Sequence, residues 1–243
     1  CLSQGKGSGM WAEYVVTSAK GGALPLHDSV SLEQGAMSMI NPLTAVAFLE
    51  IAKQAGHKII VLTAAASALG QMVNRLARSE GVQVINVVRR DAQVELLKEQ
   101  GATIVLNSSE ADFDQQLHDA CHQAEAHLAF DAVAGPMTLQ LLDALPEHSK
   151  VTVYSCLSYE AAQAGADHLI FEDKAVDGFW MGPWINKRNL IQILMLWRRA
   201  QKLMATELKS EVRARYPFQE AKVAVQEYLS QMTGGKILLI PDQ

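Results

Sequence analysis

The stretch that decides the fold spans residues 58–77 and reads KIIVLTAAASALGQMVNRLA. Its first six residues form a run of β-branched and aliphatic side chains, which is typical of a buried strand. A turn of small residues, ending at Gly70, comes next. Beyond it, apolar residues recur with helical spacing at positions 69, 72, 73, 76 and 77. The order strand, tight turn, helix predicts the first half of a β-α-β unit.

The same alternation continues along the chain. Further strands are expected at residues 83–88, 103–106, 128–133, 150–154, 175–181 and 236–240. Helices are expected at residues 91–100, 112–124, 138–144, 186–207 and 218–231. On the long helix, Leu190, Ile191, Leu194 and Trp197 share one face, which we expect to pack into the core. The fold class predicted from this order is α/β, with a doubly wound parallel sheet.

The two ends of the chain differ from its middle. Residues 1–40 are rich in turns, with one short strand expected at residues 13–17, and the last residues form a lone strand. We interpret both ends as parts of a second domain, which gives boundaries at 1–40, 41–205 and 206–243. The chain starts at Cys1 rather than Met, so we expect a segment upstream to be missing.

The composition excludes several classes of protein. Hydrophobic residues make up 49% and charged residues 19% of the 243 positions, unlike a disordered chain. The net charge of −5 argues against a generic nucleic-acid partner. The apolar run at residues 190–197 is far shorter than the ~20 residues of a spanning helix, so no membrane association is expected. Three scattered cysteines favour a reducing compartment, and we expect a cytoplasmic location.

The turn after the first strand is the place where a doubly wound sheet binds the pyrophosphate of a dinucleotide. A complete G-x-G-x-x-G is absent, because only Gly70 is present in the turn. An ordinary strand-to-helix turn with small packing residues is the alternative interpretation.

Two arginines follow the second strand. Arg89 and Arg90 stand about 20 residues beyond Gly70, where an NAD enzyme places an acid on the ribose 2′-hydroxyl. Guanidinium groups there can bind a 2′-phosphate through charge-assisted hydrogen bonds. A solvated pair, with one arginine bonded to Asp91, is the alternative. The position favours NADP.

Four segments then carry a resemblance to a known family. They are NPLTA at residues 41–45, INVVR at 85–89, GFWM at 178–181 and GKILL at 235–239. The chain resembles the medium-chain dehydrogenase/reductase superfamily, in its zinc-independent branch of NADPH:quinone reductases and mitochondrial-type enoyl-thioester reductases. The resemblance implies a Rossmann domain flanked by parts of a GroES-like, β-rich catalytic domain.

The resemblance also implies which residues contact the cofactor, NADPH. Around the pyrophosphate it places Ala66, Ser67, Ala68 and Leu69, and around the 2′-phosphate Arg89, Arg90 and Asp91. On the nicotinamide side it places Asn41, Thr44, Tyr154, Ser155, Cys156, Leu157, Phe179, Trp180, Met181 and Lys236. Ser155 and Cys156 depart from the family, whose members often have Gly-Gly there. The catalytic residue is unknown, because the Tyr of the enoyl reductases would lie upstream of this chain.

No metal site is expected. Cys121 and His122 are adjacent on a predicted helix and point in different directions, and the other histidines are solitary. Near Asn41, where a zinc-dependent relative would offer a cysteine, this chain has Met39 and Ile40.

These observations predict an NADPH-dependent reductase that delivers hydride to an activated alkene, such as an enoyl thioester or enone, or to a quinone. An alcohol or carbonyl dehydrogenase of the same superfamily and a non-catalytic nucleotide-binding protein are the alternatives. The expected partners are a small-molecule substrate and a second copy of the chain. We expect this chain to bind NADPH but to turn over substrate negligibly, because the substrate pocket is built largely by the absent domain.

Overall fold

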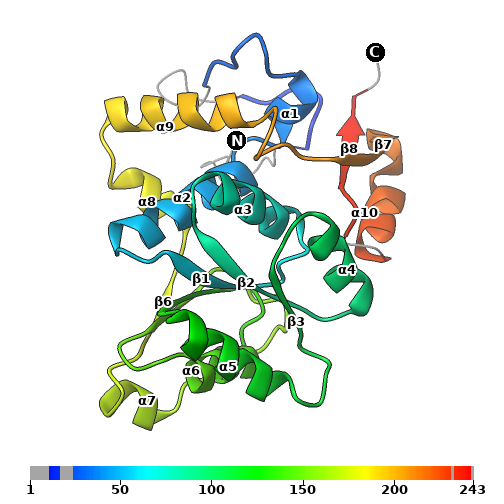
Figure 1. Cartoon of the computed structure of the whole chain (residues 1–243). Coiled ribbons are helices and arrows are strands. Elements are labelled where there is room, and N and C mark those ends of the chain that lie inside the picture. The colour runs from blue at the N-terminus through cyan, green and yellow to red at the C-terminus, as the bar shows by residue number, and fades with distance from the viewer. Residues whose placement is uncertain (1–10, 17–23, 231–232, 242–243) are drawn as a thin grey trace.

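A six-stranded parallel sheet forms the centre of the molecule (Figure 1). The computed structural model describes residues 11–16, 24–230 and 233–241. The strands lie in the order β3-β2-β1-β4-β5-β6, and every adjacent pair is parallel. Their bounds are β1 Ile59–Thr63, β2 Gln83–Val88, β3 Ile104–Asn107, β4 Leu128–Asp131, β5 Lys150–Val153 and β6 Ala175–Gly178. The chain adds β2 and β3 on one side of β1 and then returns to add β4, β5 and β6 on its other side. Ligands bind in such sheets at this switch point between β1 and β4.

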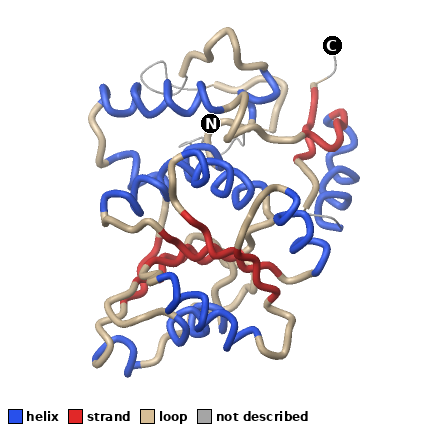
Figure 2. The backbone as a smooth tube through the Cα atoms, in the orientation of Figure 1, coloured by secondary structure: helices blue, strands red, loops and turns tan. Residues whose placement is uncertain are grey.

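Helices cover both faces of this sheet, as the layers in Figure 2 show. Along β1, Ile60 and Leu62 pack with the helices of one layer, whereas Val61 packs with those of the other. The first layer holds α2 Asn41–Gln54, α3 Ala68–Ser79, α4 Asp91–Glu99, α8 Met181–Asn186 and α9 Leu190–Leu203. The second holds α5 Phe113–Ala124 and α6 Pro136–Ala144. The predicted α/β class with a doubly wound parallel sheet is confirmed.

A second, two-stranded sheet lies apart from the first, next to α10 (Figure 1). It pairs β7 Val212–Pro217 with β8 Lys236–Ile240 in parallel. The connection between them contains η1 Phe218–Glu220 and α10 Ala221–Ser230. Two further short helices are α1 Leu32–Ala36 and α7 Ala166–Ile170. Within the part of the chain that the structure describes, no helix combines the length and the apolar character needed to cross a membrane.

Three expected elements differ from the structure. The sixth strand ends at Gly178 rather than at residue 181, because Trp180 is the N-cap of α8. The long helix expected at residues 186–207 spans only Leu190–Leu203, since Asn189 forms a capping box with Gln192 and so sets the start of α9. Residues 13–16 form no strand, and Thr17 lies outside the described residues. The strand β7 was not predicted, although its sequence VRARYP alternates apolar residues with arginines as a half-buried strand does.

The expected core face of α9 is wrong for three of its four residues. Leu190 and Ile191 are 69% and 70% exposed, and Leu194 is 41% exposed. Trp197 is buried, and its indole N–H donates to the carbonyl oxygen of Pro25 at 2.8 Å. The helix packs through Leu196, Trp197 and Ala200 instead, so its contact face is rotated from the stripe at its N-terminus.

Candidate functional site

The turn between β1 and α3 is built around Ser67 and Gly70. Ser67 is the N-cap of α3, and its Oγ accepts a hydrogen bond from the Gly70 N–H at 3.1 Å. A Cβ on Gly70 would lie 2.2 Å from the carbonyl oxygen of Ala65, so only glycine fits there. Ala64 holds a left-handed conformation with a φ of 49°. The chain therefore turns sharply and brings the helix N-terminus close to the end of the strand.

This helix N-terminus has the chemistry of a phosphate site. Ala68 and Leu69 stand at the first two positions of α3, where backbone N–H groups have no acceptor within the helix. Ala66 is buried in the core of the first helix layer and supports the turn from inside, whereas Ser67, Ala68 and Leu69 are partly exposed. The 12-residue helix adds the positive end of its dipole. Of the predicted pyrophosphate residues, Ala66, Ser67, Ala68 and Leu69 are all brought together here.

The predicted 2′-phosphate residues lie beside this turn. The Ala65 N–H donates to the carbonyl oxygen of Val87 at 3.2 Å, which ties the turn to the last residues of β2. Arg89 and Arg90 follow directly and are both exposed. Among the described residues, neither guanidinium forms an ion pair or a hydrogen bond. Two unpaired positive charges thus stand next to the phosphate-binding turn.

A buried carboxylate organises the end of β4. Asp131 is fully buried, and its Oδ1 accepts from Thr63 Oγ1 at 2.9 Å and from the Val133 N–H at 2.8 Å. Its Oδ2 accepts from Thr138 Oγ1 at 2.8 Å and from the Ala134 N–H at 3.2 Å. These bonds fix the turn in which Ala134 takes a φ of 61°. The sequence analysis missed this network; its signal is a lone acid at the end of an apolar strand.

The residues after β5 run along the same edge. The Leu157 N–H donates to the carbonyl oxygen of Ala132 at 3.0 Å, so residues 154–158 lie against the turn that Asp131 holds. Cys156 is exposed, and its thiol donates to the carbonyl oxygen of Glu160 at 3.2 Å. Ser155 and Leu157 are also exposed. Three of the four predicted residues can therefore contact a ligand at this edge.

Tyr154 behaves differently from its neighbours, because its ring packs into an aromatic cluster. The ring of Phe48 stacks on Phe130 at 4.0 Å, and Tyr154 and Phe179 meet Phe48 edge-on at 4.8 and 5.2 Å. Burial, with the charge of Asp131 adding to it, raises the pKa of the Tyr154 phenol well above its usual range. Tyr154 and Phe179 thus hold the ends of β5 and β6 against α2.

The aromatic cluster also locates the start of α2. This helix precedes β1 and packs antiparallel to it, so the N-terminus of the helix lies at the carboxyl end of the strand. Asn41 and Thr44, in the first turn of the helix, therefore lie near the carboxyl end of the sheet. Thr44 is buried, and Asn41 is half-buried. Beyond β6, Trp180 is 74% exposed, and Met181 is buried.

Lys236 is not brought to the six-stranded sheet. It begins β8 in the two-stranded sheet, and its Nζ lies 5.7 Å from the centre of the Tyr228 ring. Its contact with the cofactor stays a prediction.

The described residues offer no metal ligands. No group of three or more His, Cys, Asp or Glu side chains among them could hold a metal ion. Cys121 is buried inside the layer of α5 and α6, and burial raises the pKa of its thiol to about 12. His122 is exposed on the same helix, so the two side chains point in different directions.

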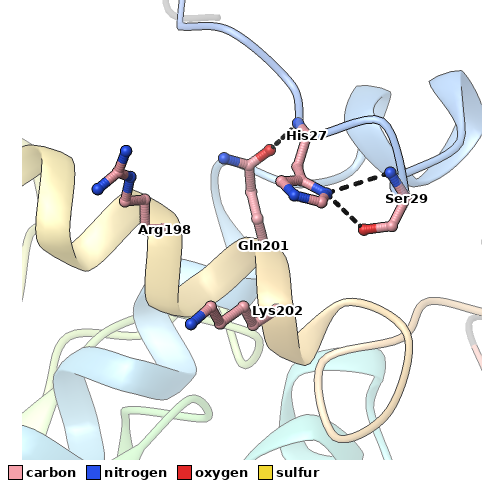
Figure 3. Close-up of a pocket in the computed structure, with 5 residues that line it drawn as sticks. All are labelled: His27, Ser29, Arg198, Gln201 and Lys202. Carbon is pink, nitrogen blue, oxygen red and sulfur yellow. Dashed lines mark hydrogen bonds between the residues drawn. The ribbon is translucent and has the colours of Figure 1, made fainter.

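A pocket of about 360 Å³ lies elsewhere, between the segment before α1 and the C-terminal half of α9 (Figure 3). It is lined by His27, Ser29, Arg198, Gln201 and Lys202. The neighbouring Arg199 bonds Glu80 at the C-terminal end of α3, which is ~20 Å along the helix from Ser67. The pocket contains none of the predicted site residues and is separate from the carboxyl edge of the sheet.

Comparisons with known proteins agree with this geometry. The family model described as zinc-binding dehydrogenase matches residues 68–195. The mitochondrial enoyl-[acyl-carrier-protein] reductase of Arabidopsis thaliana is 29% identical over 238 residues, covering 93% of this chain and 61% of its own length. A Mesorhizobium loti protein assigned to the NADPH:quinone reductases is 34% identical in its crystal structure, with a TM-score of 0.83 over 90% of this chain and 64% of that one.

A third structure, the complex of Etr1p with NADP and crotonyl-CoA, is 18% identical and has a TM-score of 0.70. It covers 86% of this chain and 62% of its own, and at this identity it supports the fold alone. The chain spans less than two thirds of the length of each of these three relatives.

Proposed function

Since this chain belongs to the zinc-binding dehydrogenase family, within the medium-chain dehydrogenase/reductase superfamily, we propose that it is the cofactor-binding part of an NADPH-dependent reductase. The proposed substrates are an activated alkene, as in an enoyl thioester or enone, or a quinone. Relatives named for both kinds of reductase support this choice. The zinc of the family name has no fitting set of ligands among the described residues, so the proposal includes no metal.

The observation that carries the proposal is the pair of unpaired guanidinium groups next to the N-terminus of α3. Arg89 and Arg90 occupy the place where an acid would bind the ribose 2′-hydroxyl of NAD. A 2′-phosphate there gains charge-assisted hydrogen bonds, which are about twice as strong as neutral ones. NADH lacks this phosphate and cannot form these hydrogen bonds.

The remaining predicted residues divide between the two halves of the cofactor. Ser67, Ala68 and Leu69 would hold the pyrophosphate through N–H donors and the helix dipole. Asn41, Thr44 and residues 155–157 would orient the nicotinamide half, as the family resemblance implies. When bound, NADPH supplies the hydride for the reduction. The protein's part is to fix the orientation of the ring and to keep water from it.

The test is calorimetric titration of NADPH and NADH into the wild type and into Arg89→Asp. We expect the wild type to prefer NADPH, and the variant to lose NADPH affinity by ~10- to 100-fold through lost charged hydrogen bonds. NADH affinity should change far less. Arg198→Ala is the matched control, because it removes an exposed arginine that lines the separate pocket. Equal affinities of the wild type for the two cofactors would refute the proposal.

A further inference from the structure

An acid stands directly after the two arginines, where it could neutralise them. Asp91 follows Arg90 in the sequence, and a carboxylate this close can reach a neighbouring guanidinium. In the structure it does not, because Asp91 Oδ1 accepts a hydrogen bond from Asn107 Nδ2 at 2.7 Å. Asp91 also lies in the first turn of α4, where the helix dipole favours its negative charge.

Asn107 is itself held in a fixed orientation. It is the last residue of β3, paired with Val88 across the sheet, and only 6% of it is exposed. Its Oδ1 accepts from the Ser109 N–H at 3.0 Å. Since the oxygen of the amide is engaged in this way, the NH₂ group must point at Asp91. Figure 1 shows β3 and α4 side by side, as this bond requires.

Two more bonds join the same neighbourhood. Ser109 Oγ donates to the carbonyl oxygen of Arg89 at 2.7 Å, and the Arg89 N–H donates to Gln93 Oε1 at 3.1 Å. The backbone of Arg89 is therefore tied both to the end of β3 and to α4. The side chain of Arg89 remains unpaired and exposed, as does that of Arg90.

We infer that Asn107 is a positioning residue for cofactor selection: it holds the Asp91 carboxylate against the β3 end and so leaves both guanidinium groups free for a 2′-phosphate. A carboxylate released from Asn107 would pair with an arginine and would repel the phosphate dianion. This inference depends on the proposed function, because it assumes that NADPH binds at this edge.

The test is a double-mutant cycle at Asn107 and Asp91, measured as dissociation constants for NADPH and NADH. We expect Asn107→Ala to reduce the preference for NADPH by ~10-fold, the size of one hydrogen bond to a charged group. Asn107→Asp keeps an oxygen for the Ser109 N–H but repels Asp91. It should reduce the preference for NADPH at least as much as Asn107→Ala does. Adding Asp91→Asn to either variant should restore the preference. The preference for adenosine 2′,5′-bisphosphate over ADP should change in the same way as the preference for NADPH: lower in the two Asn107 variants and restored by Asp91→Asn.

Two results would overturn the inference while leaving the proposed function intact. One is a wild-type preference for NADPH that persists in Asn107→Ala and Asn107→Asp. The other is a parallel loss of NADPH and NADH affinity that Asp91→Asn does not restore, which is the result expected if Asn107 only supports the fold. A wild type without any preference for NADPH would instead refute the proposed function, and the inference with it.

Discussion

Gly70 is the residue on which the shape of the phosphate-binding turn depends. A Cβ at this position would overlap the backbone of Ala65, with its carbonyl oxygen at 2.2 Å. We expect Gly70→Ala to lower the free energy of unfolding by about 1–3 kcal/mol, because the helix must shift away from the strand. Urea denaturation measures this. Gly182→Ala is the control, since its Cβ would meet the Trp180 ring at an ordinary 3.5 Å. Equal losses in both variants would contradict this account of Gly70.

Sequence reasoning found the site residues whose role depends on their distance from a strand end. Gly70, Arg89 and Arg90 are of this kind, because a strand and its following turn can be located from local pattern. Asp131 and Asn107 are not. Asp131 bonds Thr63, 68 positions away, and Asn107 bonds Asp91, 16 positions away. Such partners become neighbours only once the strand order is known.

At the scale of elements, a histidine in the turn before β1 predicts that the stability of the fold depends on pH. His57 precedes β1 and His127 precedes β4, and their rings lie 6.4 Å apart. Burial first, and then the charges of His127 and Lys150, lower the pKa of His57 below 6.5. Below about pH 6.5 the unfolded chain therefore binds more protons than the folded one, and stability falls with falling pH. Above that pH, His57 is neutral in both states.

We expect the free energy of unfolding of the wild type to decline as the pH falls from about 7 to about 5. The free energy of unfolding of His57→Asn should decline less steeply over the same range. Urea denaturation at a series of pH values gives both slopes. Identical slopes for the wild type and the variant would show that His57 does not contribute to the pH dependence of stability.

The elements themselves were predictable where burial leaves a clear pattern. The five strands from β1 to β5 are rich in aliphatic and aromatic residues, and each starts and ends within two residues of its expected position. The spacing of apolar residues did not predict which side chains of a surface helix are buried. The stripe of Leu190, Ile191 and Leu194 has helical spacing, yet it faces solvent, because contacts with α2 and the segment around Pro25 set the rotation of α9. Periodicity identifies a face but not the element that covers it.

At the scale of the whole molecule, β6 is an edge strand of the large sheet within the part of the chain that the structure describes. It pairs with β5 on one side, and the exposed Trp180 follows it directly. Such edges invite pairing with another chain. We therefore predict a homodimer, which sedimentation velocity of dilute protein can detect as a species of twice 26.5 kDa. A single 26.5 kDa species at every concentration would contradict the prediction.

The central claim is that the carboxyl edge of the six-stranded sheet holds NADPH, and a crystal structure of this chain with NADPH tests it most directly. The account predicts the pyrophosphate at the N–H groups of Ala68 and Leu69, and the 2′-phosphate between Arg89 and Arg90, with Asp91 still bonded to Asn107. A cofactor bound elsewhere, or one whose 2′-phosphate contacts neither arginine, would contradict it.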